Sequence, residues 1–386
     1  MRFSILLPTR NRLDLLKLAI ESVRTQDYAD CEIVVQDNAS DEDVCGYVAS
    51  LGDARVACAR NAALVPVTEN WNLALERARG DYLIMLGDDD ALVPGCLARL
   101  AALAREWREP EAIYMQALQY AYPGVIPGHP RGFVQRAYNA FLEGAQRPFL
   151  LERATALRMV RGAMSFRLLY GFNMQYFVVS RALVERLRER GPFFQSPYPD
   201  YYAANAVLLA ARTVVACPQP LALIGISPKS FGYYYFNRRE REGMDFLQNT
   251  AADATPPGRV PGTDMNDCWL TAMETLARNF GNEAPLRVDR RRYRLLQFAA
   301  TLRLRSWRGL PTVLRHARAS ELLGYGAALA LYGAAWLLPP RLRRSGQRRI
   351  RAGFSATPPF DPGRSDVPYS DILEAARAYG AAPSPP

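Results

Sequence analysis

Three consecutive aspartates, Asp88 to Asp90, follow an apolar stretch at residues 82–86 and a single glycine. Adjacent carboxylates repel one another, so folding gains nothing from placing three of them at the end of a buried strand. A divalent cation removes that repulsion, because Mg²⁺ and Mn²⁺ prefer carboxylate oxygen, and a metal that also binds a diphosphate neutralises charge on a leaving group. The alternative is a solvated acidic turn that caps a helix starting near Pro94.

Two more polar clusters, residues 9–12 and 37–41, also follow short apolar runs. The apolar runs predict strands, and helical spacing between them predicts helices, in the order 3–7, 13–23, 31–35, 42–50, 55–59, 70–79 and 82–86. Short apolar strands that alternate with helices indicate an α/β fold with a mostly parallel sheet and helices on both faces. Ligands of such sheets bind beyond the carboxyl ends of the strands, where all three clusters converge.

The remainder of the chain has a looser pattern. Prolines and glycines predict a loop over 123–132, and residues 133–170 are expected to be mainly helical. The sequence further predicts strands over 112–118, 172–180, 214–217 and 221–226, and helices over 181–190, 201–211 and 264–338. The proline-rich tail from residue 355 is expected to be a poor core former and partly disordered.

Composition limits the function classes. Apolar residues make up 49% and charged residues 22% of the 386 residues, as in ordinary globular proteins. Six scattered cysteines without a Cys-x-x-Cys pair predict reduced, buried thiols in place of a zinc site or a disulfide framework. Only two histidines are present, which argues against a histidine-based metal site and a Ser-His-Asp triad. The apolar run at the N-terminus is too short for a signal peptide.

Positive charge is concentrated near the C-terminus. Sixteen arginines and only two acidic residues lie between Arg287 and Arg351, so the rest of the chain is net acidic although the whole carries +10. Residues 322–338 are apolar and uncharged, short for a membrane span, and are followed by six arginines. Two alternatives stay open: attachment to an anionic membrane surface, or a core helix with a solvated basic face. No nucleic-acid module accompanies the arginines, so nucleic acid is not expected as a partner.

Three motifs in a fixed order carry a resemblance to a known family. Each lies beside a predicted strand, and they read Pro8-Thr9-Arg10-Asn11-Arg12, then QDNASD at residues 36–41, then GDY at 80–82 continuing to GDDDAL at 87–92. In this order and spacing they resemble the N-terminal half of family 2 glycosyltransferases. The resemblance is sharp over residues 1–95, thinner to about residue 235, and does not cover the C-terminal region. It implies a GT-A (Rossmann-like) fold and inverting transfer of a sugar from a nucleoside diphosphate with Mg²⁺ or Mn²⁺.

The same resemblance implies roles for individual residues. The nucleotide is expected to contact Pro8, Thr9, Arg10, Arg12, Asp37, Asn38, Asn72 and Asp88. Among these, Thr9 and Arg10 would line the base pocket, Asp37 would bond to the base and Asp88 would contact the ribose. The metal ligand would be Asp89 or Asp90, because Gly87 stands where many relatives have a first aspartate. The alternatives are an N-cap for Asp37 and an ordinary asparagine near a helix start for Asn72.

Inverting transfer also needs a base that takes the proton of the acceptor hydroxyl. In the family this base is an aspartate or glutamate about a hundred residues after the metal motif. Asp200 lies 112 residues after Asp88, in a proline-rich loop that enters a helix, and is the expected catalytic residue; the alternative is a helix N-cap. Residues 227–235 would form a lid or acceptor edge with Lys229 near phosphate, or else a plain surface loop.

The expected protein is therefore an inverting glycosyltransferase that uses a UDP-, dTDP- or GDP-sugar and a saccharide or lipid-linked acceptor in polysaccharide or glycolipid biosynthesis. The alternatives are a sugar-nucleotide pyrophosphorylase, disfavoured because no glycine-rich basic loop follows the first strand, and an inactive scaffold at the membrane. A cytoplasmic location is expected, peripheral to the inner face of the cytoplasmic membrane if the membrane alternative holds.

The expected organisation has four parts. The first is a GT-A domain at residues 1–235, with a nucleotide-sugar half at 1–110 and an acceptor half at 111–235. A linker (236–263), a basic helical region (264–352, with membrane contact through 322–351) and a proline-rich tail (353–386) follow it.

Overall fold

The computed structural model describes residues 1–126, 130–136, 139–230, 233–234, 242, 258–283, 285–303, 308–337 and 368–380. The arginines from Arg341 to Arg351, the proline-rich stretch up to residue 367 and most of the expected linker lie outside these described residues.

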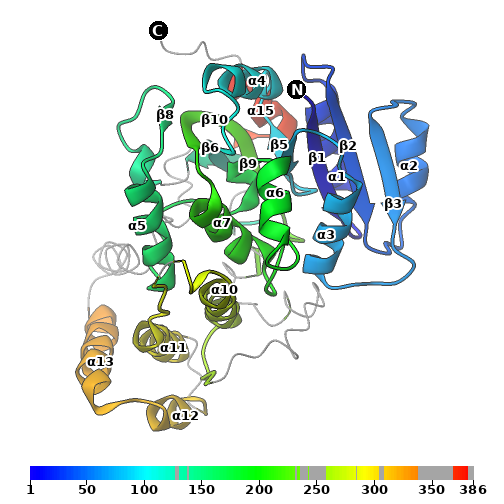
Figure 1. Ribbon diagram of the computed structural model, residues 1–386. Coiled ribbons are helices and arrows are strands. Elements are labelled where there is room, and N and C mark those ends of the chain that lie inside the picture. Colours follow the sequence, from blue (N-terminus) through cyan, green and yellow to red (C-terminus); the bar gives the residue numbers. More distant parts are fainter. Residues whose placement is uncertain are drawn as a thin grey trace.

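The N-terminal part alternates strictly between strand and helix. Its elements are β1 (Phe3–Thr9), α1 (Leu13–Arg24), β2 (Cys31–Asp37), α2 (Val44–Ser50), β3 (Val56–Arg60), α3 (Val67–Arg77) and β4 (Tyr82–Met85). The strands pair in parallel in the order β3-β2-β1-β4, and the register sets Thr9 opposite Asp37 at the carboxyl ends (Figure 1). All seven residues of β1 are buried, as expected for a central strand covered on both faces.

The second part completes the sheet with antiparallel and parallel strands. It comprises β5 (Ala91–Leu92), α4 (Cys96–Glu106), β6 (Ala112–Ala121), β7 (Gly132–Arg136), η1 (Ala140–Leu142), β8 (Phe149–Leu150), α5 (Arg153–Met164), η2 (Met174–Tyr176), β9 (Phe177–Ser180), α6 (Arg181–Arg188), α7 (Pro199–Ala210) and β10 (Val214–Ile226). Strand β9 runs antiparallel between β4 and β6, and β10 runs parallel to β6. The expected α/β architecture with a mostly parallel central sheet and helices is confirmed.

One local expectation is wrong in this region. Residues 133–170 were expected to be mainly helical, yet β7 begins at Gly132 and pairs antiparallel with β6. The five residues of β7 are too few to show a clear period, and their strand conformation depends on pairing with a partner that is distant along the chain.

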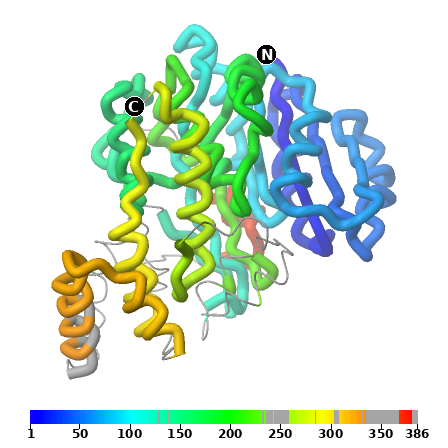
Figure 2. Tube along the Cα trace, turned by 60° about the horizontal axis from the view of Figure 1, so that its bottom comes forward, coloured from blue at the N-terminus to red at the C-terminus, as the bar shows by residue number. Residues whose placement is uncertain are grey.

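The C-terminal part is helical. Helices α10 (Asp264–Phe280), α11 (Arg290–Arg303), α12 (Leu310–Arg315), η3 (Ala319–Glu321) and α13 (Leu322–Leu337) gather at the end of the molecule away from β1–β3 (Figures 1 and 2). Within the described residues, no helix has the length and apolar character needed to cross a membrane. After the gap, β11 (Pro368–Tyr369) and α15 (Ile372–Gly380) return to the sheet.

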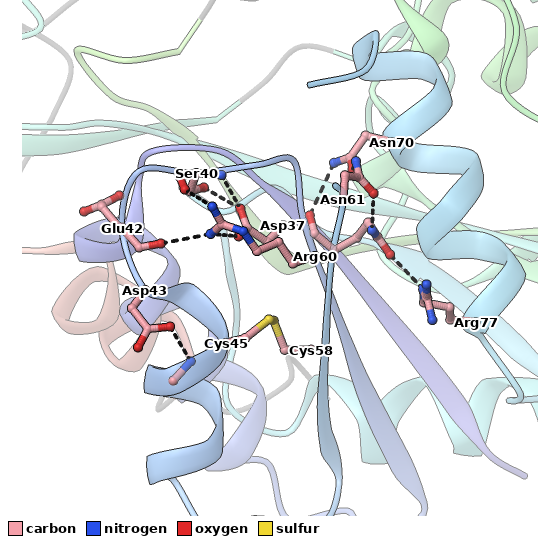
Figure 3. Close-up of a disulfide and its surroundings, with 12 residues drawn as sticks. Asp37, Ser40, Glu42, Asp43, Cys45, Cys58, Arg60, Asn61, Asn70 and Arg77 are labelled. Carbon is pink, nitrogen blue, oxygen red and sulfur yellow. Dashed lines mark hydrogen bonds and ion pairs between the residues drawn. A yellow bond between two sulfur atoms is a disulfide. The ribbon is translucent and has the colours of Figure 1, made fainter. Parts of the chain in front are cut away.

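The expectation of reduced thiols is wrong for two cysteines. Cys45 on α2 and Cys58 on β3 form a disulfide, with their Cα atoms 5.4 Å apart (Figure 3). Helix α2 packs on β3, which brings together two cysteines separated by 13 positions. The expectation holds for the other four, Cys31, Cys96, Cys217 and Cys268, which are buried and form no disulfide.

Candidate functional site

The acidic turn, residues 87–90, leaves the carboxyl end of β4 and is buried. Asp90 accepts hydrogen bonds from the Gly87 amide (2.6 Å), the Gln175 side-chain amide (2.8 Å) and the Gly225 amide (2.7 Å). Its two oxygens are thus occupied by donors from the turn itself, η2 and β10. Asp90 therefore connects the acidic turn to η2 and β10.

Asp88 is held by residues from the end of β1. The Thr9 hydroxyl donates to it at 2.7 Å, and the Arg12 guanidinium forms an ion pair with it at 2.8 Å. Burial alone would lower the pKa of Arg12, but the neighbouring carboxylates, Asp88 first among them, raise it. Arg12 therefore stays charged and neutralises part of the acidic turn.

Asp89 has a different partner. The buried Ser227 hydroxyl donates to one oxygen of Asp89 at 2.8 Å. Burial raises the pKa of both Asp89 and Asp90. Repulsion from Asp88 raises the pKa of Asp89 further, although Arg12 lowers it, and repulsion from Asp89 raises the pKa of Asp90. This buried turn holds three carboxylates and is paired with one guanidinium, so its negative charge is only partly neutralised.

The segment after β10 lies against the same turn. The Lys229 ammonium donates to the Asn11 carbonyl oxygen at 3.0 Å and lies 3.4 Å from an Asp14 oxygen, while Arg12 donates to the Lys229 carbonyl oxygen. Residues 227–230 therefore connect β10 to the start of α1 across the site. Phe231, Gly232 and Tyr235 of the expected lid lie outside the described residues.

Asp37 lies at the end of β2, opposite Thr9, and is fully buried. One of its oxygens accepts bonds from the Ser40 amide and hydroxyl, and the other pairs with Arg60 at 2.9 Å; Figure 3 shows these three side chains grouped beside the disulfide. The N-cap of α2 is Asp43, so Asp37 does not cap that helix. Its predicted contact with a base stays a prediction.

Four other predicted nucleotide contacts are placed as follows. Pro8 is buried in β1, Arg10 follows that strand, and Asn38 bonds both the amide and the carbonyl of Val65. The Asn72 amide exchanges bonds with the backbone of Phe194 and lines a cavity of about 700 Å³ between α3 and residues 188–195. Asn38 and Asn72 thus hold loops around the site, and their contact with nucleotide stays a prediction.

Asp200 comes close to the acidic turn through two adjacent residues of η2. The Met174 amide donates to Asp200 at 2.7 Å, and the next residue, Gln175, donates to Asp90. Burial raises the pKa of Asp200 to about 7, although the bond from Met174 lowers it. This carboxyl therefore has a pKa suited to accepting a proton near neutral pH.

Sequence reasoning missed two residues of this site, Gln175 and Gly225, and it included Ser227 in the expected lid without predicting its bond to Asp89. A Cβ on Gly225 would lie 1.8 Å from the Asp89 carbonyl oxygen, so only glycine lets β10 pass this close to the turn. Gly87 is likewise crowded, because a Cβ there would lie 2.6 Å from an Asp90 oxygen. The closely spaced residues Gly225 and Ser227, and likewise Gly87 and Asp90, would have indicated this site only if the pairing of β10 had already been known.

A divalent cation fits the chemistry of the donor set. Among the residues described, no three histidine, cysteine, aspartate or glutamate side chains are arranged as a metal cluster. Mg²⁺ is commonly held by one or two carboxylates together with substrate phosphates, and the acidic turn offers such carboxylates.

Part of the chain is similar in sequence to known glycosyltransferases. Residues 4–158 match the family described as glycosyl transferase family 2. The chain is 36% identical over 108 residues to the GalNAc(5)-diNAcBac-PP-undecaprenol beta-1,3-glucosyltransferase of Campylobacter jejuni, and 30% identical over 135 residues to the putative colanic acid biosynthesis glycosyl transferase WcaA of Escherichia coli K12. These matches cover 27% and 33% of this chain, and 35% and 48% of the relatives, so the chain spans about a third to a half of their length.

A solved structure of S. aureus TarS, residues 1–349 in complex with UDP-GlcNAc, resembles the fold with a TM-score of 0.50 and 13% identity. The likeness covers 86% of this chain and 92% of that one. Thr9, Arg12, Asp37 and the acidic turn all fall inside residues 4–158, the part of the chain that matches glycosyl transferase family 2.

Proposed function

We propose that the protein transfers a sugar from a nucleoside-diphosphate sugar to a hydroxyl of a saccharide or lipid-linked acceptor, with inversion at the anomeric carbon. The observation that carries the proposal is the approach of Asp200 to the acidic turn through Met174 and Gln175, although the two carboxylate groups are far apart in sequence. Asp200 would take the proton of the acceptor hydroxyl while the oxygen attacks the anomeric carbon and the diphosphate leaves.

The donor would bind at the carboxyl ends of β1, β2 and β4. Arg12 and Lys229 supply positive charge beside Asp88, which suits a diphosphate. A divalent cation held by Asp89 would neutralise charge on the leaving diphosphate. Asp89 is favoured over Asp90 as the ligand, because the oxygens of Asp90 already accept three hydrogen bonds. The matched TarS structure holds UDP-GlcNAc, which supports a uridine donor as the first to test.

The acceptor class is supported by the relatives. The Campylobacter jejuni relative and the E. coli protein WfaP are named as beta-1,3-glucosyltransferases with undecaprenol-linked diphosphate acceptors. Their names favour sugar transfer over the pyrophosphorylase alternative, and a lipid-linked saccharide is the acceptor to test first.

The test is sugar transfer to a lipid-linked saccharide acceptor by the wild-type chain and by Asp200→Asn. We expect the variant to bind donor nucleotide normally and to lose transfer by about 10²- to 10⁴-fold, because only the base is removed. Asp27→Asn changes an exposed aspartate and should leave both measurements unchanged. Unchanged turnover in Asp200→Asn would remove Asp200 from the mechanism. Absence of transfer by the wild-type chain from every donor tested would favour the inactive scaffold.

Helix α13 supports a proposed contact of the protein with a membrane surface. It packs on α11 through Tyr325, whose ring stacks on Phe298 at 4.5 Å, and it leaves Leu322 and Leu323 exposed to solvent by 55% and 87%. Six arginines follow it in the sequence. An apolar helix with exposed leucines, followed in the sequence by clustered arginines, suits the surface of an anionic bilayer, where a lipid-linked acceptor would also lie.

Sedimentation with vesicles checks this location. The wild-type chain should bind vesicles that contain phosphatidylglycerol more tightly than vesicles of phosphatidylcholine alone, and Leu323→Glu should weaken the binding. Leu169→Glu changes a leucine that is 38% exposed outside α13 and serves as the matched control. Equal binding by Leu323→Glu and the wild-type chain would contradict a membrane contact through α13.

A further inference from the structure

Residues 368–380, near the C-terminal end of the chain, pack against the sheet. Strand β11 pairs antiparallel with β7, with Pro368 opposite Phe133 and Tyr369 opposite Gly132. Helix α15 then packs against α1, β5, β7 and β10 (Figures 1 and 2). This packing was not expected, because the tail from residue 355 was predicted to be a poor core former and partly disordered.

The start and end of α15 are both fixed. Asp371 accepts a bond from the Glu374 amide, and Glu374 accepts bonds from the Ser370 amide and hydroxyl, a reciprocal arrangement that stabilises the first turn. At the other end, a Cβ on Gly380 would lie 2.8 Å from the Pro94 ring, so the helix end fits closely against the turn after β5.

The buried face of α15 belongs to a small apolar cluster separate from the main core. Ile372, Ala375 and Ala376 are almost fully buried in it, together with Leu15, Ala91, Val93, Leu118, Tyr120, Tyr122, Val125, Val134, Leu223 and Ile226. The spacing of the three α15 residues at i, i+3 and i+4 places them on one face of the helix.

Several residues of this cluster are close in sequence to residues of the site, and one is hydrogen-bonded to the acidic turn. Ala91 directly follows Asp90, and Ile226 directly precedes Ser227, the partner of Asp89. The Tyr122 hydroxyl donates to the Asp89 carbonyl oxygen at 3.1 Å. Leu15 lies in the first turn of α1, three residues after Arg12. The apolar face of α15 therefore lies beneath the elements that present Asp88, Asp89 and Ser227.

We propose that residues 368–380 are a positioning segment for donor binding: docking of α15 fixes β5, β10 and the start of α1, and so holds the acidic turn in its binding geometry. Ile372 is the central positioning residue, because it is fully buried among side chains of these elements. The inference rests on the proposed function for its effect on the donor, but its structural part can be measured without any ligand.

The experiment compares Ile372→Ala with Val313→Ala, which removes buried methyl groups from α12 at the far helical end. Hydrogen exchange of the ligand-free full chain should be about tenfold faster over 86–93 and 223–227 in Ile372→Ala, and unchanged there in Val313→Ala. Ile372→Val should restore wild-type exchange, and Arg377→Ala, on the exposed face of α15, should match the wild type. If Ile372→Ala does not fold, Ala376→Ser places a hydroxyl in the same contact and is measured instead.

A second readout separates positioning from stability. With Mn²⁺ and UDP, GDP or dTDP, Ile372→Ala should weaken nucleotide binding and raise the donor KM by about tenfold while kcat stays near the wild-type value. Unchanged exchange over 86–93 in the α15 variants would overturn the positioning role, whatever the nucleotide results. Absence of nucleotide binding by the wild-type chain would overturn the proposed function and leave the exchange result standing.

Discussion

At the scale of single residues, the site depends on a glycine that carries no reactive group. Gly225 donates its amide to Asp90 and leaves no room for a side chain beside the Asp89 carbonyl. We predict that Gly225→Ala separates β10 from the acidic turn, lowers the free energy of unfolding by about 1–3 kcal/mol through overpacking, and abolishes nucleotide binding. Denaturant unfolding and calorimetric titration measure the two effects.

Gly326→Ala is the control for this substitution. A Cβ at Gly326 would meet no atom within 4 Å, and alanine is the better helix former, so this variant should fold and bind as the wild type does. Normal nucleotide binding by Gly225→Ala would show that the contact between β10 and the turn is not needed.

The pKa of Asp200 predicts a pH dependence. A base must be ionised to accept a proton, and burial raises the pKa of Asp200 to about 7. With donor and Mn²⁺ saturating, kcat should rise about tenfold per pH unit below 7 and level off above it. An aspartate at its ordinary pKa would give a kcat independent of pH from 5.5 upward. A flat profile over pH 5.5 to 8.5 would therefore contradict the role of Asp200 as base.

Several of these residues could be predicted from the sequence alone, since Thr9, Asp37 and Asp88 each lie at or just beyond the end of a strand with a clear apolar run. Their convergence follows from parallel pairing. Gly225 and the bond of Ser227 to Asp89 could not be predicted, because both depend on β10, which reaches the acidic turn only by pairing with β6 and β5 across more than a hundred residues.

At the scale of elements, the disulfide joins α2 to β3 beside the ion pair of Asp37 and Arg60. We predict that the double variant Cys45→Ser, Cys58→Ser loses about 3 kcal/mol of unfolding free energy, the value that the entropy of the unfolded chain gives for a loop of this length. Urea unfolding with and without reductant measures the loss.

Cys31→Ser is the matched control, because it removes a thiol that forms no disulfide. Reductant should destabilise the wild type and the Cys31→Ser variant alike, and should have no effect on the double variant. An equal response of the double variant to reductant would contradict the disulfide.

The elements of the first hundred residues were predictable because each has a strong period and clear turn residues. Strand β7 was missed because it is short and depends on a distant partner. Helix α15 was missed because prolines before and after it dominate the composition of the tail, although Ile372, Ala375 and Ala376 already have helical spacing. The Cys45–Cys58 pair has no local signal, since only the packing of α2 on β3 brings the two together.

At the scale of the whole molecule, the two halves of the sheet and the C-terminal segment all meet at one acidic turn. The turn receives bonds from β1, η2 and β10, and the cluster around α15 lies beneath it. Three buried carboxylates with one guanidinium remain costly to ionise together, which a cation and a diphosphate bound with it would offset.

The most direct test of this account is calorimetric binding of UDP, GDP, dTDP and CMP to the full chain with Mn²⁺, with Asp89→Ala as the site variant and Asp27→Ala as the control. The account predicts that one nucleoside diphosphate binds in a metal-dependent manner, that binding is lost in Asp89→Ala or with chelator, and that Asp27→Ala binds normally. Absence of metal-dependent binding to all four nucleotides would contradict it, and residues 88–90 would then be an acidic turn without a ligand.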